Sequence, residues 1–136
     1  MKKALRDKLL TILPLIQVIG KQVYTFPIPP SAIKPYVVLA CPSSIPSHTL
    51  KGGNKVYKEI WRIDVCSEDE PEANLLVSYI EDGMDMKRGT WGNMKVHGCV
   101  LNEIRDLSEL ENSDNDKAIF RKNLEFSIIR QLIYCT

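Results

Sequence analysis

The sequence predicts an α+β fold with one mostly antiparallel β-sheet of about four to five strands and two main helices packed against it. Two segments, residues 2–13 and 67–84, carry apolar residues at the three- and four-residue spacings of amphipathic helices. Several other segments are rich in the β-branched and aromatic residues that strands favour. These predicted strands follow one another without regular helical crossovers, which favours antiparallel neighbours.

Length and composition indicate one ordinary globular domain, residues 1–136. The chain has 44% hydrophobic and 26% charged residues, which is typical neither of a disordered protein nor of a membrane protein. No apolar run approaches the ~20 residues of a spanning helix, and no signal peptide is evident, so we expect synthesis in the host cytoplasm and no membrane partner. The cysteines lack C-x-x-C spacing, which argues against zinc and favours buried thiols: Cys41, Cys66, Cys99 and Cys135.

The first third of the chain predicts a helix followed by two strands. An apolar stripe predicts the helix, which Pro14 should end: Leu5, Leu9, Ile12 and Leu13. Val23 and Tyr24 then begin a strand that stops at a proline cluster. Residues 34–40 are apolar on both strand faces, so we expect a buried strand in the middle of the sheet.

The central third predicts a loop, a strand and a helix. Residues 42–55 are rich in Pro, Ser and Gly, which predicts a mobile loop or hairpin tip. The next strand should pack one face, on which four residues lie: Tyr57, Trp61, Ile63 and Val65. Ser67-x-x-Glu70 is a predicted capping box, with Pro71 in the first turn of a helix that ends at Gly83 or Gly89. A stripe on that helix should pack on the sheet: Ala73, Leu76, Tyr79, Ile80 and Met84.

The last third predicts two strands, residues 94–104 and 119–133. One face of the second strand is apolar: Phe120, Leu124, Phe126 and Ile128. The acidic stretch between them, residues 103–116, is expected to be a second mobile loop or a short helix. Charge is divided along the chain, with +8 over residues 1–58 and −7 over residues 59–136. This division is either an incidental property of solvated faces or a pair of complementary association surfaces.

No catalytic, cofactor-binding or metal-binding residues are predicted, and we expect a protein that is not an enzyme. His97 and Cys99 should share a strand face, but no third residue is evident to orient them, and His48 lies in a predicted loop. No phosphate-binding glycine motif follows a strand. Three lysines flank the first predicted loop without any nucleic-acid-binding motif: Lys51, Lys55 and Lys58. Trp61 and Trp91 are interpreted as packing residues.

Taken together, the predicted elements and a "VY…P…PYVV…IDV" skeleton resemble the siphophage tail-completion proteins, also called tail terminators or tail-to-head joining proteins. The skeleton comprises Gly20-Lys21-Gln22-Val23-Tyr24, Lys34-Pro35-Tyr36-Val37-Val38 and Ile63-Asp64-Val65, and the resemblance covers residues 2–130. The long acidic stretch and the Ser/Pro/Gly loop depart from the family pattern.

The resemblance implies a virion protein that caps the tail tube, terminates its growth and joins the tail to the head as a hexameric ring. Its partners would be the major tail tube protein, the head-completion (stopper) protein and further copies of itself, and DNA would only pass through the ring channel. The subunit would be able to remain monomeric before assembly, with the loops at 42–55 and 103–116 becoming ordered on contact. No cofactor or catalytic residue is implied.

Two alternatives remain at this point. A head-completion or stopper connector would share the ring but bind the portal side. A small cytosolic regulatory or nucleic-acid-binding module would make use of the basic N-terminal half, with DNA affinity that falls as salt rises.

Overall fold

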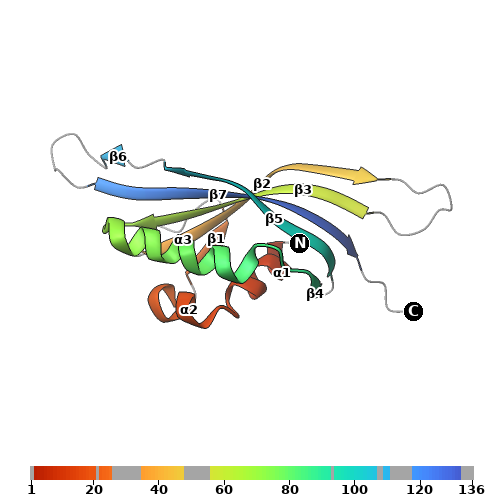
Figure 1. The fold of residues 1–136 in the computed structure, drawn as a ribbon, viewed down its shortest axis with the longest axis horizontal. Helices are drawn as coiled ribbons and strands as arrows, with labels where there is room; N and C mark the ends of the chain where they lie inside the picture. The colour runs from red at the N-terminus through yellow and green to blue at the C-terminus, as the bar shows by residue number, and fades with distance from the viewer. Residues whose placement is uncertain are drawn as a thin grey trace.

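The computed structural model describes residues 2–20, 22–25, 35–47, 56–92, 94–106, 109–110 and 118–132. Within these ranges, one curved seven-stranded sheet packs by one face on three helices, and its other face carries no helix (Figure 1). The elements are α1 (Lys2–Leu9), α2 (Leu13–Ile19), β1 (Val23–Thr25), β2 (Tyr36–Ser47), β3 (Val56–Ser67), α3 (Glu70–Met84), β4 (Gly89–Trp91), β5 (Met94–Asp106), β6 (Glu109–Leu110) and β7 (Ala118–Leu132).

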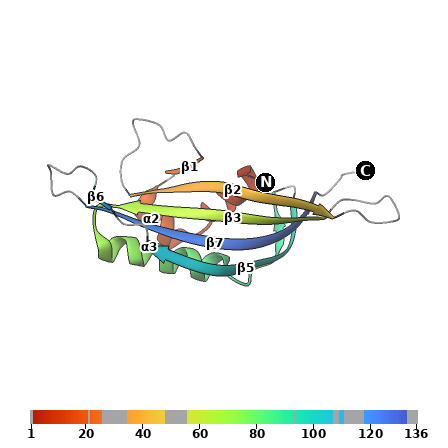
Figure 2. The same ribbon diagram turned by 90° about the horizontal axis from the view of Figure 1, so that it is seen from above.

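The predicted α+β class and the mostly antiparallel sheet are confirmed, with more elements than expected. The strand order is β1-β2-β3-β7-β5-β4, and β6 pairs with β7 (Figure 2). The strand predicted at Val23 and Tyr24 is β1. The additional strands β4 and β6 are three and two residues long, too short to give a periodic sequence signal. The pairing of β1 with β2 is parallel, whereas the other pairings are antiparallel.

The N-terminal helix ends earlier than predicted, and Pro14 begins a second helix. α1 stops at Leu9, and Pro14 lies in the first turn of α2, where the missing proline N–H costs no helical hydrogen bond. Leu5 and Leu9 of the predicted stripe are fully buried and Ile12 packs against the core. The prediction is wrong for Leu13, which is 67% exposed because the chain begins a second helix there. Gly20 closes α2 with φ of 62°, a conformation that favours glycine.

The sheet interior agrees with the predicted strand faces. Residues 37–39 of β2 are buried between β1 and β3, as expected for a strand apolar on both sides. β3 pairs with β7 along the whole length of β3. The helix-facing side chains of this pair are buried where prediction placed them: Trp61, Ile63, Val65, Leu124, Phe126 and Ile128.

The loop predicted at residues 42–55 is wrong over its first part. β2 continues to Ser47, because Ser43–Ser47 pair with Val56–Ile60 of β3 after a bulge between Ala40 and Ser43. Pro42 lies in that bulge and Pro46 on an edge strand, the two positions where a strand tolerates proline. Residues 48–55 lie outside the described residues.

The capping box is also wrong, although the helix is where it was predicted. The N-cap of α3 is Asp69, whereas Ser67 Oγ accepts from the Asp69 N–H at 3.1 Å and donates to Glu72 Oε1 at 2.8 Å. Ser67 thus supports the turn before the helix. The predicted core stripe is confirmed by burial of Ala73, Leu76, Ile80 and Met84, with Tyr79 packed beside it, and α3 ends at Met84.

The acidic stretch is partly strand rather than loop. Residues 103–106 continue β5, and Glu109–Leu110 form β6, because β7 supplies a partner strand for both. Residues 107–108 and 111–117 lie outside the described residues. No helix in the described part of the chain is long and apolar enough to cross a membrane.

Candidate functional site

The candidate histidine–cysteine pair is separated by a bulge in β5. The register shifts between Val96 and Gly98, which inserts His97 as an extra residue. His97 is exposed, with Nε2 at 3.1 Å from Gln131 Oε1, whereas Cys99 is fully buried. Burial, with a contribution from the Asp85 carboxylate, raises the pKa of Cys99 to about 12. The expectation that these side chains share a face is therefore wrong, and the thiol stays protonated at neutral pH.

The other residues considered for chemistry do not converge. Within the described ranges, no group of three or more His, Cys, Asp or Glu side chains is placed to hold a metal ion. His48, Lys51 and Lys55 lie outside these ranges. An open hollow of about 330 Å³ lies between α1 and β4, where the Lys8 ammonium sits 5.7 Å from the Trp91 ring centroid. Trp61 and Trp91 are both buried, as predicted for packing residues.

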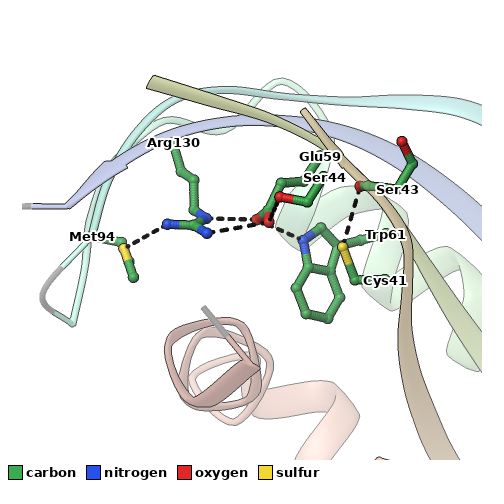
Figure 3. A network of polar contacts seen from close by, with 7 residues as sticks. All are labelled: Cys41, Ser43, Ser44, Glu59, Trp61, Met94 and Arg130. Atoms are coloured by element: carbon green, nitrogen blue, oxygen red, sulfur yellow. Dashed lines mark hydrogen bonds and ion pairs between the residues drawn. The ribbon is translucent and has the colours of Figure 1, made fainter. Parts of the chain in front are cut away.

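A buried polar network joins β2, β3, β5 and β7 on the helix-facing side of the sheet (Figure 3). Arg130 binds the Glu59 carboxylate through Nε at 2.6 Å and Nη2 at 3.2 Å. The same carboxylate accepts from Ser44 Oγ at 2.6 Å and from Trp61 Nε1 at 3.2 Å. Glu59 is only 3% exposed, so side chains from three strands, β2, β3 and β7, meet at one desolvated carboxylate.

The Arg130 guanidinium is held on further sides. Its carbon lies 4.3 Å from the Tyr57 ring centroid, and Nη1 is 3.6 Å from Met94 Sδ (Figure 3). Burial raises the pKa of Glu59, but the hydrogen bonds from Arg130, Ser44 and Trp61 outweigh that effect, so the pKa lies below its ordinary value. This network fixes the end of the sheet where β2 and β3 extend past the helices (Figure 1).

Sequence reasoning missed this network although a signal was present. Glu59 is in phase with Trp61, Ile63 and Val65, and Arg130 is in phase with Ile128. A charged residue in phase with a buried stripe, on each of two strands, indicates a paired buried charge. The registers of β3 and β7 were needed to bring the two together.

The face of the sheet without helices has a polar half. Near the β5–β6 end, Asp64 accepts from Arg121 Nη2 at 2.7 Å and also from the Asn123 amide. Arg62 pairs with Glu125 at 3.7 Å, and Arg105 pairs with Glu103 at 2.9 Å. The charges in this half are balanced within the chain.

The other half of the same face carries apolar side chains that alternate with serine and lysine. Pairing aligns Ile45, Lys58, Ile129 and Gly98 in one row and Ser43, Ile60, Ser127 and Val100 in the next. Ile45 is 61% exposed, Val100 44% and Ile129 40%, and Ile60 is half-buried. We call these four residues the outer apolar patch. Lys58 lies in the first row, between Ile45 and Ile129, and Lys95 lies in the row beyond it. Both lysines are exposed, and no acid occurs in these three rows.

The pieces of the predicted family skeleton meet in the sheet. Val23 of β1 pairs with Val37 of β2, which pairs with Val65 of β3, and all three side chains are buried. In the adjacent row, Tyr24 pairs with Val38, which pairs with Asp64. Segments that are 40 residues apart in sequence therefore form one continuous unit of the core.

The fold resembles a chain of a gene transfer agent virion. That chain comes from a solved structure described as the virion of a native gene transfer agent (GTA) particle. The TM-score is 0.60 at 14% sequence identity, and the alignment covers 96% of each chain. The likeness therefore extends over the whole domain and concerns its fold. No family model matches the sequence, and no curated protein is significantly similar to it.

Proposed function

We propose that the chain is a structural protein of a phage or phage-like virion, and that it completes the tail. The observation that carries the virion role is the fold shared with a chain of the gene transfer agent virion across 96% of both chains. A fold shared over nearly the whole length supports a common architecture, and architecture determines which surfaces a subunit presents to its neighbours.

The tail-completion role rests on the family skeleton. Its three segments form neighbouring strands, with Val23, Val37 and Val65 in one buried row, as expected if the skeleton is a core signature rather than a chance match. In this role the chain caps the tube of major tail protein, stops its growth and provides the surface that meets the head-completion protein. It acts as a ring, expected to be a hexamer, and its role involves no catalytic step.

The exposed face of the sheet suits a subunit whose role is to bind other proteins of an assembly. The described residues display an unpartnered sheet face, part apolar and part charged, rather than a site where catalytic groups converge. Interfaces of this mixed character are ordinary for assemblies whose parts first exist separately.

Electron microscopy of the encoding phage or prophage, with this gene deleted and then restored on a plasmid, tests the proposal. We expect DNA-filled heads and unattached tails of irregular or excessive length, and joined virions when the native gene is restored. A plasmid carrying an early stop codon is the matched control. Unattached tails of normal length would instead support a head-side connector, and joined virions in the deletion strain would contradict a virion assembly role.

A further inference from the structure

We propose that the outer apolar patch binds the outward face of α3 in a second copy of the chain, so that copies associate head to tail. The inference deepens the proposed function and rests on it for the choice of a second copy as the partner. The outward face of α3 is the stripe formed by Pro71, Leu75, Ser78 and Asp82, which are all exposed.

The patch has the properties of a surface that is covered in an assembly. Its exposed side chains Ile45, Val100 and Ile129 come from three different strands and lie within two adjacent rows. Gly98, in line with Ile129, adds no side chain, and a Cβ placed there would meet no atom within 4 Å. Gly98 therefore leaves open space beside Ile129, where a protruding side chain can contact the apolar residues of the patch.

Charge selects the partner. Lys58 lies within the patch, between Ile45 and Ile129, and Lys95 lies in the row beside it. The acids in the row on the other side of the patch, Glu125 and Glu103, are already paired with Arg62 and Arg105. All charged residues of α3 are acidic, namely Glu70, Glu72, Glu81 and Asp82, and Glu68 and Asp69 precede it. Leu75, 46% exposed, lies in the middle of the α3 stripe. An apolar residue on a helix whose charges are all acidic is thus matched to a group of apolar residues that has lysines within and beside it.

The alternative of joining copies through sheet edges is disfavoured. The edge of β2 beyond Leu39 carries Pro42 and Pro46, neither of which has an N–H to donate. β5 carries bulges at His97 and Asn102, and bulges are devices that block pairing at an edge. The bare face of the sheet is therefore the better surface for self-association.

The proposed contact uses two different surfaces of each subunit. The patch lies on the bare face of the sheet, whereas α3 lies on the opposite, helix-covered side (Figure 1). Each copy can therefore offer its patch to one neighbour and its α3 to another. Such a heterologous contact repeats around a ring when the rotation closes, and it cannot be satisfied in a two-fold symmetric dimer alone.

Site-specific cross-linking tests the contact in the purified full chain. A variant with both Leu75→Cys and Ile129→Cys is treated with a short bis-maleimide, and multimers are counted on a denaturing gel. We expect a ladder that extends beyond dimers, at a yield several-fold above both single variants and above the parent chain with its native cysteines. The yield of cross-linked multimers should fall as salt rises, because salt screens the attraction between Lys58 and Lys95 of one copy and the acidic residues of α3 in the other.

The matched control combines Ile129→Cys with Leu13→Cys, since Leu13 is an equally apolar and even more exposed residue, on α2. Equal ladders for the test and control pairs, or no ladder from the test pair, would overturn the proposal.

A mixing experiment provides an independent arm. Ile129→Arg destroys the patch but keeps α3, and Leu75→Arg does the reverse; both sites are exposed, so the fold should be retained, as circular dichroism would verify. By analytical ultracentrifugation, each variant alone should stay monomeric, whereas a mixture should form dimers and nothing larger. Failure of the mixture to dimerise, at concentrations where the native chain associates, would contradict a head-to-tail contact.

The two proposals fail in different ways. A cross-linked ladder from a chain whose gene deletion leaves virions intact would retain this contact and remove the tail role. Abnormal tails in the deletion strain, without a ladder, would retain the tail role and remove this contact.

Discussion

Arg130 on β7 donates from Nε to Glu59 Oε1 on β3 at 2.6 Å, and the carboxylate that it meets is almost completely removed from water. The two residues are diagonal neighbours across the strand pair, since Tyr57 is the direct partner of Arg130. This ion pair therefore joins β3 and β7, two neighbouring strands that are far apart in the sequence.

Removing the arginine should be strongly destabilising. Arg130→Met leaves the Glu59 carboxylate buried without its counter-charge, and a loss of about 3–5 kcal/mol in the free energy of unfolding is expected for such a change. Urea titration followed by tryptophan fluorescence measures it, since Trp61 is itself a partner of Glu59. The control is Arg62→Met, which breaks the more exposed pair with Glu125 and should cost at most about 1 kcal/mol. Equal losses of unfolding free energy in Arg130→Met and Arg62→Met would contradict the view that burial makes the Arg130–Glu59 pair the more important one.

Stability should decrease in acid partly through Glu59. The pKa of its carboxyl in the folded protein lies below the ordinary value of 4.5, so its contribution is fully present above that value and is lost as the pH falls through the folded-state pKa. Glu59→Gln removes the titrating group. The difference in unfolding free energy between the native chain and Glu59→Gln should therefore narrow as pH is lowered below about 4.5. A difference that stays constant with pH would show that the pKa of the Glu59 carboxyl is the same in the folded and unfolded protein, which would contradict the lowered pKa.

Cys99 should resist thiol reagents. Its sulfur is fully buried and burial raises its pKa to about 12, so almost no thiolate exists at pH 8. Iodoacetamide labelling with peptide mass mapping should modify Cys99 only as fast as the protein unfolds, and half-buried Cys41 should react sooner. Equal labelling rates for the two, under native conditions, would be inconsistent with this structure.

Gly83 and Ile12 should be coupled. A Cβ at Gly83 would lie 2.6 Å from Ile12 Cδ1 and 2.8 Å from Cγ1, so Gly83→Ala overpacks the contact between α3 and the residue that precedes α2. Strain of about 1–3 kcal/mol should exceed the ~1 kcal/mol gained in helix propensity. In an Ile12→Ala background the strain disappears, and Gly83→Ala should become stabilising by about 1 kcal/mol.

Asn74→Ala, at an exposed position of the same helix, is the control for that cycle. It should give the same small gain in both backgrounds. A Gly83→Ala effect that does not depend on residue 12 would contradict the close contact.

The parts of the fold that could be predicted are those in which hydrophobic period and tertiary burial agree. The stripe of Trp61, Ile63 and Val65, and that of Leu124, Phe126 and Ile128, required no knowledge of partners. Periodicity fails where the chain gains an extra residue, as at His97, because every later side chain is turned to the other face.

Local composition does not predict secondary structure where a segment becomes a strand only by pairing with a neighbouring strand. Residues 43–47 have the residue types of a loop, yet β3 supplies a ladder that they join. Pro14 could be recognised as a helix boundary, but whether it ends one helix or begins another depends on the packing of residues 15–19.

The outer apolar patch could not be predicted from the sequence either, because its members come from four strands: Ile45, Ile60, Val100 and Ile129. Ile45 lies in a segment predicted to be a loop, and Ile60 and Ile129 lie off the predicted apolar stripes of their strands. Only the registers of the four strands show that they are adjacent.

The two bulges of β5 have a consequence for the shape of the molecule. Thirteen residues, Met94–Asp106, run beside the eleven of Lys122–Leu132, so one side of this strand pair is longer than the other. A strand with an extra residue opposite its partner bends at that point, so two bulges in β5 curve this side of the sheet. His97 and Asn102 are the surplus residues, so deleting either would keep the core residues of β5 and β7 paired while flattening the bend. The curvature of the sheet thus depends on the extra residues at two exposed positions of β5. A single insertion or deletion there can change the curvature while the packing of the core stays the same.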